Sequence, residues 1–111
     1  MTDYEFGDIV LVNFPHSGAQ RVKRRPALVV LDIGDADLVL APITTRERAD
    51  AGDVRLDGWR ESGLLRESWV RLAKVASLEK RLVSRRLGRL SNADRVQTAQ
   101  SWSMLFRLPS R

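Results

Sequence analysis

The sequence has no cysteine and a single histidine, and these two shortages narrow the chemistry that the protein can perform. Without cysteine the chain cannot form a disulfide or a thiolate metal site. With one histidine, a zinc centre built from the usual ligands is not expected either. We therefore predict no metal site and no cofactor, and any catalysis should be metal-independent.

Long apolar runs are also missing. No run approaches the ~18 residues that span a membrane, and residues 1–5 are acidic where a secretory signal would be basic. We therefore expect a cytoplasmic protein with no membrane partner. No stretch rich in proline, glycine or serine marks a linker, so residues 1–111 should form one domain. A core of this size gives only modest stability, which makes a homodimer unsurprising.

Positive charge, in contrast, is in excess. The formal net charge is +5, and the basic residues are clustered. One cluster consists of Arg21, Lys23, Arg24 and Arg25, and a second of Lys80, Arg81, Arg85, Arg86 and Arg89. Each cluster is either a contact surface for phosphates or a solvated face.

Short apolar runs between glycines and prolines predict several strands. The expected strands are residues 8–14, 27–33, 38–43, 53–56 and 69–72. Residues 15–26 and 44–52 are predicted to be polar loops, and the turn at 34–37 predicts a β-hairpin between its neighbours. Pro42 fits only an edge or a strand end.

The last third of the chain is less uniform. Residues 75–90 are ambiguous, with a helical turn at 77–80 or a strand at 87–90 as options. Ser91 and Asp94 resemble a helix capping box, which predicts a helix from Asn92 to about Arg107. In that helix Val96, Ala99, Ser103 and Phe106 follow helical spacing. The predicted fold is α+β and mainly β, a small twisted barrel or half-barrel with a C-terminal helix.

The sequence contains no phosphate-binding glycine loop, nucleophile elbow, kinase signature or metalloprotease motif. The candidates that remain stand at predicted strand ends. Arg25 precedes one strand, Thr44 and Thr45 follow another, and Lys74 follows a third. Strand ends can bring such groups together.

The order and spacing of several motifs resemble the MazF/PemK family of toxins. The motifs are Gly7-Asp8-Ile9-Val10, Arg25-Pro26-Ala27-Leu28-Val29, Ala41-Pro42-Ile43-Thr44-Thr45, Gly63-Leu64-Leu65, Val70-Arg71-Leu72 and Leu87-Gly88-Arg89-Leu90. Each is weak alone, but together they cover nearly the whole chain.

This resemblance implies an SH3-like barrel of the MazF/PemK/CcdB type. It also implies a homodimer that cleaves single-stranded RNA at a short recognised sequence and is silenced by a cognate antitoxin. The family's catalytic arginine falls on Arg25 and its catalytic threonine or serine on Thr44, with Thr45 as the near alternative. The residues that we assign to substrate binding are Pro15, His16, Ser17, Lys23, Arg24, Thr45 and Lys74. Lys74 stands where some members have a glutamine, which leaves the base preference open.

The chemistry suits these residues. The adjacent 2′-hydroxyl of RNA can attack the phosphorus, which leaves a 2′,3′-cyclic phosphate and a 5′-hydroxyl. A guanidinium such as Arg25 can hold two phosphate oxygens as charge develops, and Thr44 can fix the in-line geometry. The general base is open, because a guanidinium gives up its proton reluctantly. His16 has a suitable intrinsic pKa but is equally an ordinary loop residue.

Each candidate also has a plain interpretation. Arg25 can pair with a carboxylate, Thr44 can cap a turn, and Lys74 can be a surface side chain. The three tryptophans are expected to fill the core or an interface, with Trp59 the most exposed. Two other functions stay open: a non-catalytic toxin of the same fold that poisons DNA gyrase, and a nucleic-acid-binding module without catalysis.

Overall fold

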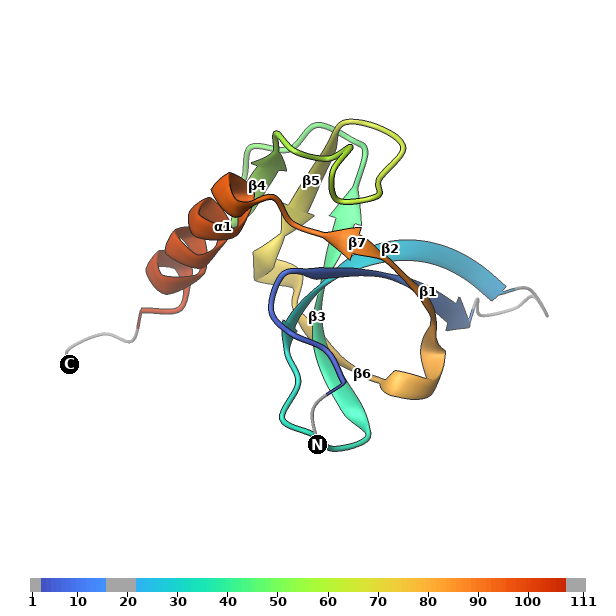
Figure 1. Cartoon of the computed structure of the whole chain (residues 1–111). Helices are drawn as coiled ribbons and strands as arrows, with labels where there is room; N and C mark the ends of the chain where they lie inside the picture. The colour runs from blue at the N-terminus through green and yellow to red at the C-terminus, as the bar shows by residue number, and fades with distance from the viewer. Residues whose placement is uncertain (1–2, 16–21, 108–111) are drawn as a thin grey trace.

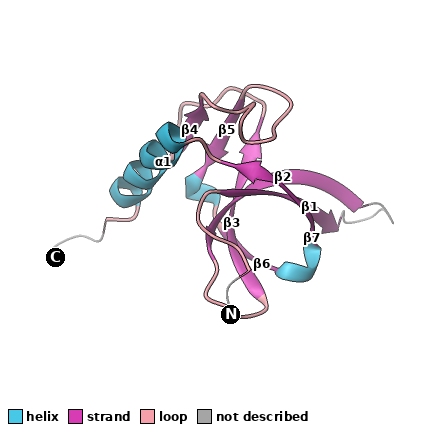
Figure 2. Cartoon of the chain, viewed as in Figure 1, coloured by secondary structure: helices cyan, strands magenta, loops and turns pink. Residues whose placement is uncertain are grey.

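The computed structural model describes residues 3–15 and 22–107, which form a strongly curved antiparallel sheet and one C-terminal helix (Figures 1 and 2). The elements are β1 (Asp8–Pro15), β2 (Val22–Leu31), β3 (Asp37–Thr44), β4 (Asp53–Leu56), β5 (Ser68–Arg71), η1 (Leu72–Lys74), β6 (Ala76–Glu79), η2 (Lys80–Leu82), β7 (Val83–Arg89) and α1 (Asn92–Leu105). No described helix has the length and apolar character needed to cross a membrane. This is the predicted α+β, mainly β, architecture.

The strand order explains the barrel shape. The sheet runs β4-β5-β3-β2-β1-β7, and β6 pairs with β3 beside β5. Strands β1, β2, β3, β6 and β7 curve around a common interior in Figure 1, whereas β4 and β5 extend the sheet toward α1. The long strand β3 therefore belongs to both parts, because its first half pairs with β6 and its end pairs with β5.

Strand β2 begins earlier than the sequence predicts. Residues 22–26 belong to β2, so the prediction of a loop over 15–26 is wrong for this part. Residues 23–25 pair with residues 12–14 of β1, and their exposed side chains let the strand continue without burying a charge. The pairing of β2 with β3 starts at Ala27, one residue after Pro26. Pro26 is therefore tolerated at the end of this pairing.

The ambiguous segment after residue 75 is mostly strand. The option of a helical turn at 77–80 does not hold, because Ala76–Glu79 form β6 and pair with residues 37–40 of β3, and the short helix η2 begins only at Lys80. A strand at 87–90 is confirmed in part, since β7 starts earlier, at Val83, and ends at Arg89. Both elements depend on partners far away in the chain, which a local pattern does not reveal.

Side chains of the strands fill two apolar clusters, one on each face of the curved sheet. The first core cluster consists of Ile9, Leu28, Ala41, Ile43, Val54, Leu56, Leu64, Val70, Leu72 and Leu90. The second core cluster consists of Val10, Val12, Ala27, Val29, Leu38 and Leu40. Consecutive residues such as Ile9 and Val10 enter different clusters, because successive side chains of a strand point to opposite faces.

The cap of α1 is as predicted, and it also anchors the helix. The hydroxyl of Ser91 accepts a hydrogen bond from the backbone N–H of Asp94 at 3.2 Å. The buried carboxylate of Asp94 in turn accepts from the N–H groups of Asp57 at 3.1 Å and Gly58 at 2.8 Å. The cap therefore ties α1 to the turn that follows β4.

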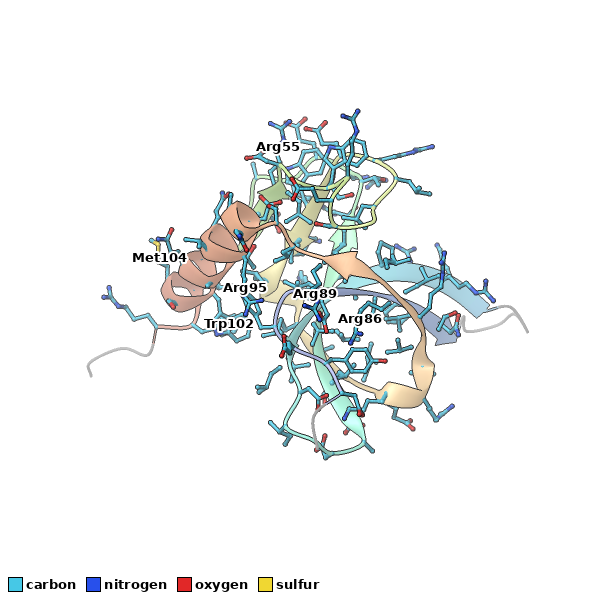
Figure 3. All side chains as sticks on the ribbon, in the orientation of Figure 1. Arg55, Arg86, Arg89, Arg95, Trp102 and Met104 are labelled. Carbon is cyan, nitrogen blue, oxygen red and sulfur yellow. The ribbon has the colours of Figure 1, made fainter. Side chains whose placement is uncertain are left out.

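The buried face of α1 is not the one that the helical spacing suggests. Val96 and Ala99 are exposed, while Thr98 is buried and Trp102 packs against the first core cluster. Figure 3 shows Trp102 turned toward the sheet and Met104 turned away from it. The inward face begins at Asp94 and continues with Thr98 and Trp102. Because Asp94 and Thr98 are polar, the spacing of apolar residues does not predict this face.

A buried carboxylate, Asp32, holds the segment before β1. It accepts hydrogen bonds from the backbone N–H groups of Asp3 at 2.8 Å, Tyr4 at 3.0 Å and Gly34 at 2.8 Å, and Lys80 Nζ lies 3.0 Å from its Oδ1. Burial alone would raise the pKa of Asp32. The ion pair with Lys80 and the three backbone donors outweigh burial, so the pKa lies well below its usual value.

We expect Asp32→Asn to lower the free energy of unfolding by about 1–3 kcal/mol at neutral pH, because an amide replaces a charged acceptor and removes one of the two carboxylates that pair with Lys80. A carboxylate whose pKa is lowered by folding stabilises the folded state at a pH above its unfolded pKa of about 3.9. This stabilisation is lost as the pH falls toward the folded pKa. Urea unfolding should therefore separate variant and wild type at pH 7 and bring them together at low pH. The control, Asp35→Asn, changes an exposed carboxylate of the same turn and should have little effect.

Candidate functional site

Two of the predicted site residues, Arg25 and Thr44, lie at the same end of neighbouring strands. The last pair between β2 and β3 at this end is Ala27 with Pro42. Arg25 lies two residues before Ala27 in β2, and Thr44 lies two residues after Pro42 in β3, so both lie beyond this pair. Since side chains alternate along a strand, both residues belong to the face of the second core cluster. The register therefore brings Arg25 and Thr44 to the same end of neighbouring strands and to the same face of the sheet.

The hydroxyl of Thr44 is held in place by the turn that follows β3. Its Oγ1 accepts a hydrogen bond from the backbone N–H of Arg46 at 3.1 Å. The plain interpretation of Thr44 as a turn cap is thus confirmed. The hydroxyl hydrogen is still free to donate to a ligand. The turn therefore orients the Thr44 hydroxyl and leaves its hydrogen available as a donor.

Arg25 is exposed and pairs with Val12 of β1 in the sheet register. Within residues 3–15 and 22–107, no carboxylate lies within 4.0 Å of its guanidinium, so the plain interpretation of an ion pair finds no partner there. An exposed guanidinium in this state can present its planar fork to two oxygens of one phosphate.

The two basic clusters differ in how their charges are used. In the second cluster, Lys80 pairs with Asp32 and Asp3, and Arg81 pairs with Glu79. Arg86 and Arg89, which are labelled in Figure 3, both pair with the buried Asp8. In this cluster only Arg85 lacks an ion pair to a described residue. Lys23, Arg24 and Arg25 of the first cluster also lack one, although Arg24 Nε donates to Asn13 Oδ1 at 3.2 Å. Within these two clusters, the cations that remain available to an outside anion therefore come from the start of β2 and from Arg85.

A groove of about 420 Å³ opens beside Thr45. It is lined by Leu11, Pro26, Thr45, Gly63, Leu64, Leu65, Arg66, Ser68, Arg85 and Leu87. Leu11 and Pro26 are paired with one another and alternate with Val12 and Arg25, so this lining lies on the opposite face of the sheet from Arg25. The groove is thus mainly apolar, with two arginines in its wall.

The remaining predicted residues are placed as follows. Lys23 and Arg24 are exposed on β2, and Lys74 is exposed on η1. His16, Ser17 and the side chain of Pro15 lie outside the described residues. In the part of the chain that is described, no three histidine, aspartate or glutamate side chains come close enough to hold a metal ion.

Residues 5–102 match the sequence profile of PemK-like, MazF-like toxins of type II toxin-antitoxin systems. The chain belongs to this family. The match includes Arg25, Thr44 and all the described strands. The resemblance carried by the sequence motifs is therefore confirmed, and the protein is a toxin of the MazF/PemK type.

Solved structures show that the toxin shares its fold with MazF proteins. The MazF-mt6 toxin of Mycobacterium tuberculosis superposes with a TM-score of 0.73 at 23% identity, over 92% of this chain and 98% of that chain. A MazE-MazF structure from Deinococcus radiodurans gives a TM-score of 0.74 at 20% identity, over 96% and 98%. An endoribonuclease bound to its cognate antitoxin, from a mycobacterial species, gives 0.76 at 19% identity, over 97% and 99%. No curated protein sequence matches the toxin.

The structure places a further residue, Trp69, beside the site. Trp69 is directly opposite Thr44 in the pairing of β3 with β5, and it is 8% exposed. The sequence predicted that Trp69 lies in the core or an interface, and it is buried. Because β5 pairs with the edge of β3 opposite to β2, Trp69 lies next to Thr44 on the side away from Arg25. Lys74, in contrast, comes after β5 and before the strand that pairs with the first half of β3. Trp69 could be recognised only from the strand register.

Proposed function

We propose that this toxin is a metal-independent endoribonuclease that cleaves single-stranded RNA and leaves 2′,3′-cyclic phosphate and 5′-hydroxyl ends. The observation that supports this most is that Arg25, exposed and without a carboxylate among the described residues, lies at the same strand end and on the same face as the turn-held hydroxyl of Thr44. In the proposed reaction, the 2′-hydroxyl attacks the adjacent phosphorus and the 5′-oxygen leaves.

Each site residue has one role in this proposal. Arg25 binds phosphate oxygens and stabilises the charge that builds on them. Thr44 donates a hydrogen bond to a phosphate oxygen and so holds the attacking and leaving oxygens in line. His16, the single histidine of the chain, has the intrinsic pKa that suits proton transfer and lies outside the described residues.

The proposed partners are single-stranded RNA, a cognate antitoxin and a second copy of the toxin, in the cytoplasm. Family membership supports the antitoxin, and two of the similar folds were solved as MazE-MazF or as an endoribonuclease with its antitoxin. An acidic segment that folds on binding would suit the cationic end of the barrel, where Lys23, Arg24 and Arg25 lie.

The deciding experiment is incubation of the pure toxin with a long single-stranded RNA in excess EDTA, followed by mapping of the ends. We expect cleavage with cyclic phosphate ends by the wild type and at least a tenfold lower rate for Thr44→Ala, because one positioned donor is lost. Folded wild type that does not cleave would refute the enzyme. Gyrase inhibition would then support the gyrase-poison alternative, and RNA binding without turnover the non-catalytic module.

The dependence of RNA affinity on salt tests the role of the first basic cluster. On an RNA that cannot be cleaved, each phosphate contact contributes about 0.7 to the slope of log Kd against log salt concentration. The double variant Lys23→Gln/Arg24→Gln should therefore lower this slope by about 1.4. Arg81→Gln is the control, since Arg81 is paired with Glu79 and should leave the slope unchanged. Equal slopes for all three proteins would place the RNA elsewhere.

A further inference from the structure

The loop that follows Thr44 crosses from one side of a strand to the other. It comprises residues 45–52, connects β3 to β4, and is called the crossover loop below. These two strands are not neighbours, because β5 lies between them and pairs with both (Figure 1). Thr44 lies opposite Trp69 at the start of β5, whereas Asp53 lies opposite Arg71 at its end. The crossover loop therefore passes over β5 and also returns along it.

The crossover loop is much longer than the gap that it closes. Neighbouring strands are about 4.8 Å apart, so two such spacings and two residues along β5 separate Thr44 from Asp53 by roughly 12 Å. At about 3.3 Å per residue, the chain between them can span roughly 30 Å when extended. The ends of the loop therefore do not determine its path, and contacts within it must do so.

Asp50 fixes the path near the far end of the crossover loop. Its Oδ2 lies 3.6 Å from Nη2 of Arg71, and its backbone N–H donates to Oδ2 of Asp53 at 3.0 Å. Nε of Arg71 also donates to Oδ1 of Asp53 at 3.3 Å, and the side chain of Asp53 is 1% exposed. Arg71 shares a face of the sheet with Thr44, because it lies two residues from Trp69, the partner of Thr44. Asp50 therefore holds the loop on the Thr44 face.

The start of the crossover loop makes the contact that orients the proposed site. Oγ1 of Thr44 accepts from the N–H of Arg46 at 3.1 Å, and this hydrogen bond is exposed. Water competes for both groups of an exposed hydrogen bond, so the bond alone contributes little to the order of the turn. It persists where the path of the loop keeps the Arg46 N–H directed at Thr44. The contacts of Asp50 with Arg71 and Asp53 supply that path.

We propose that Asp50 is a positioning residue for RNA cleavage, which orients the hydroxyl of Thr44 by holding the crossover loop to Arg71. This inference rests on the proposed function. Asp50 acts through Arg46 and Thr44 and does not bind the RNA, because its negative charge repels phosphate. Its side chain is 73% exposed, so its ion pair adds little to global stability. The loss of Asp50 should therefore appear in turnover and not in folding.

The first experiment is a double-mutant cycle on RNA cleavage. Asp50→Asn should lower kcat about fivefold and keep KM within about twofold of the wild type, because the orientation of Thr44 is loosened while the groups that bind RNA remain. Asp50→Glu keeps the carboxylate and should restore kcat to within about twofold. In the Thr44→Ala background, Asp50→Asn should cause no further loss, because Asp50 acts through Thr44. The same loss in that background, or no loss in either, would overturn the proposal.

The matched control for this cycle is Asp57→Asn. Asp57 is also an exposed aspartate that pairs with an arginine, since its Oδ1 lies 4.0 Å from Nε of Arg55 and its side chain is 75% exposed. It follows β4 and is not part of the crossover loop. Asp57→Asn should therefore cleave RNA at the wild-type rate. An equal loss of kcat in this control would show that any lost surface charge lowers the rate, and the specific role of Asp50 would be refuted.

The second experiment does not depend on cleavage. Exchange of the Arg46 amide with water, measured by NMR, reports how well the hydrogen bond to Thr44 is kept. We expect about tenfold faster exchange in Asp50→Asn, wild-type exchange in Asp57→Asn, and no change in the paired strands β1 and β2. Unchanged exchange at Arg46 would refute the coupling between Asp50 and Thr44. Faster exchange throughout β1 and β2 would give Asp50 a general role in stability and would also overturn the proposal.

These experiments separate the failure of the positioning role from the failure of the proposed function. If the wild type does not cleave RNA but exchange of the Arg46 amide depends on Asp50, the enzyme is refuted while the coupling through the crossover loop stands. If the wild type cleaves RNA and Asp50→Asn matches it in kcat and in amide exchange, the enzyme stands and the positioning role is refuted.

Discussion

Replacing Arg25 with alanine is expected to lower kcat for RNA cleavage by about 100- to 1,000-fold, the loss seen when an enzyme loses one donor to a developing oxyanion. The side chain is exposed and has no ion pair among the described residues, so the free energy of unfolding should change little. Arg25→Lys keeps the charge but replaces the planar fork with a point charge, and we expect it to recover only a small part of the rate. Single-turnover cleavage at saturating enzyme measures these effects on the chemical step.

The neighbouring residue provides the control for this prediction. Arg24→Ala removes the same charge from the next position of β2, where the side chain points to the other face and donates to Asn13. It should raise Kd for RNA and leave the single-turnover rate at saturation close to that of the wild type. Loss of rate to the same extent in both variants would mean that the positive charge of the segment matters and not the position of Arg25.

Replacing Gly63 with alanine is expected to destabilise the fold by about 3–5 kcal/mol, which is at the upper end for a single substitution. Gly63 has a φ of +83°, a conformation that strains any residue with a Cβ. The added methyl would also overlap the backbone carbonyl of Leu87. That carbonyl belongs to β7, which is paired with β1 and has little freedom to move. Urea unfolding followed by circular dichroism measures the loss.

Gly7→Ala separates the two causes of this effect. Gly7 also has a positive φ, +100°, but a Cβ there would meet only the end of the Arg95 side chain, at 3.1 Å from Nη1. We expect a loss of about 1–2 kcal/mol from the backbone conformation. If Gly63→Ala costs no more than this, the close approach of Gly63 to the Leu87 carbonyl adds nothing to the backbone strain.

Local signals in the sequence were enough to predict several elements. The strand at 53–56 and the start of α1 agree with the structure, because flanking glycines and the Ser91 cap are short-range features. The first part of β2 and all of β6 were not predicted as strands. Their residues are charged or polar, and they become strands because β1 and β3 offer edges for pairing. Tertiary pairing overrode local preference in both cases.

The candidate site shows the same division. Arg25 and Thr44 were candidates because they stand at predicted strand ends, and the family resemblance assigned their catalytic roles. The structure places them at the same end of β2 and β3. Trp69 was expected in the core or an interface, and Arg66 was not singled out. Their positions depend on the register of β5 and on the path of the turn before it, and neither is encoded in a motif.

The ion pairs of Asp8 have a consequence for how the chain is made. Asp8 is buried, and both of its cations, Arg86 and Arg89, come from β7; Arg86 follows it by 78 residues. At about 5–20 residues per second, the ribosome adds Arg86 on the order of 4–16 s after Asp8. Until then β1 has an unpaired edge and an uncompensated carboxylate, and β2, which carries Arg25, has no stable neighbour on that side. We therefore expect β2, and with it the proposed cleavage site, to reach its stable fold only after the ribosome has made β7.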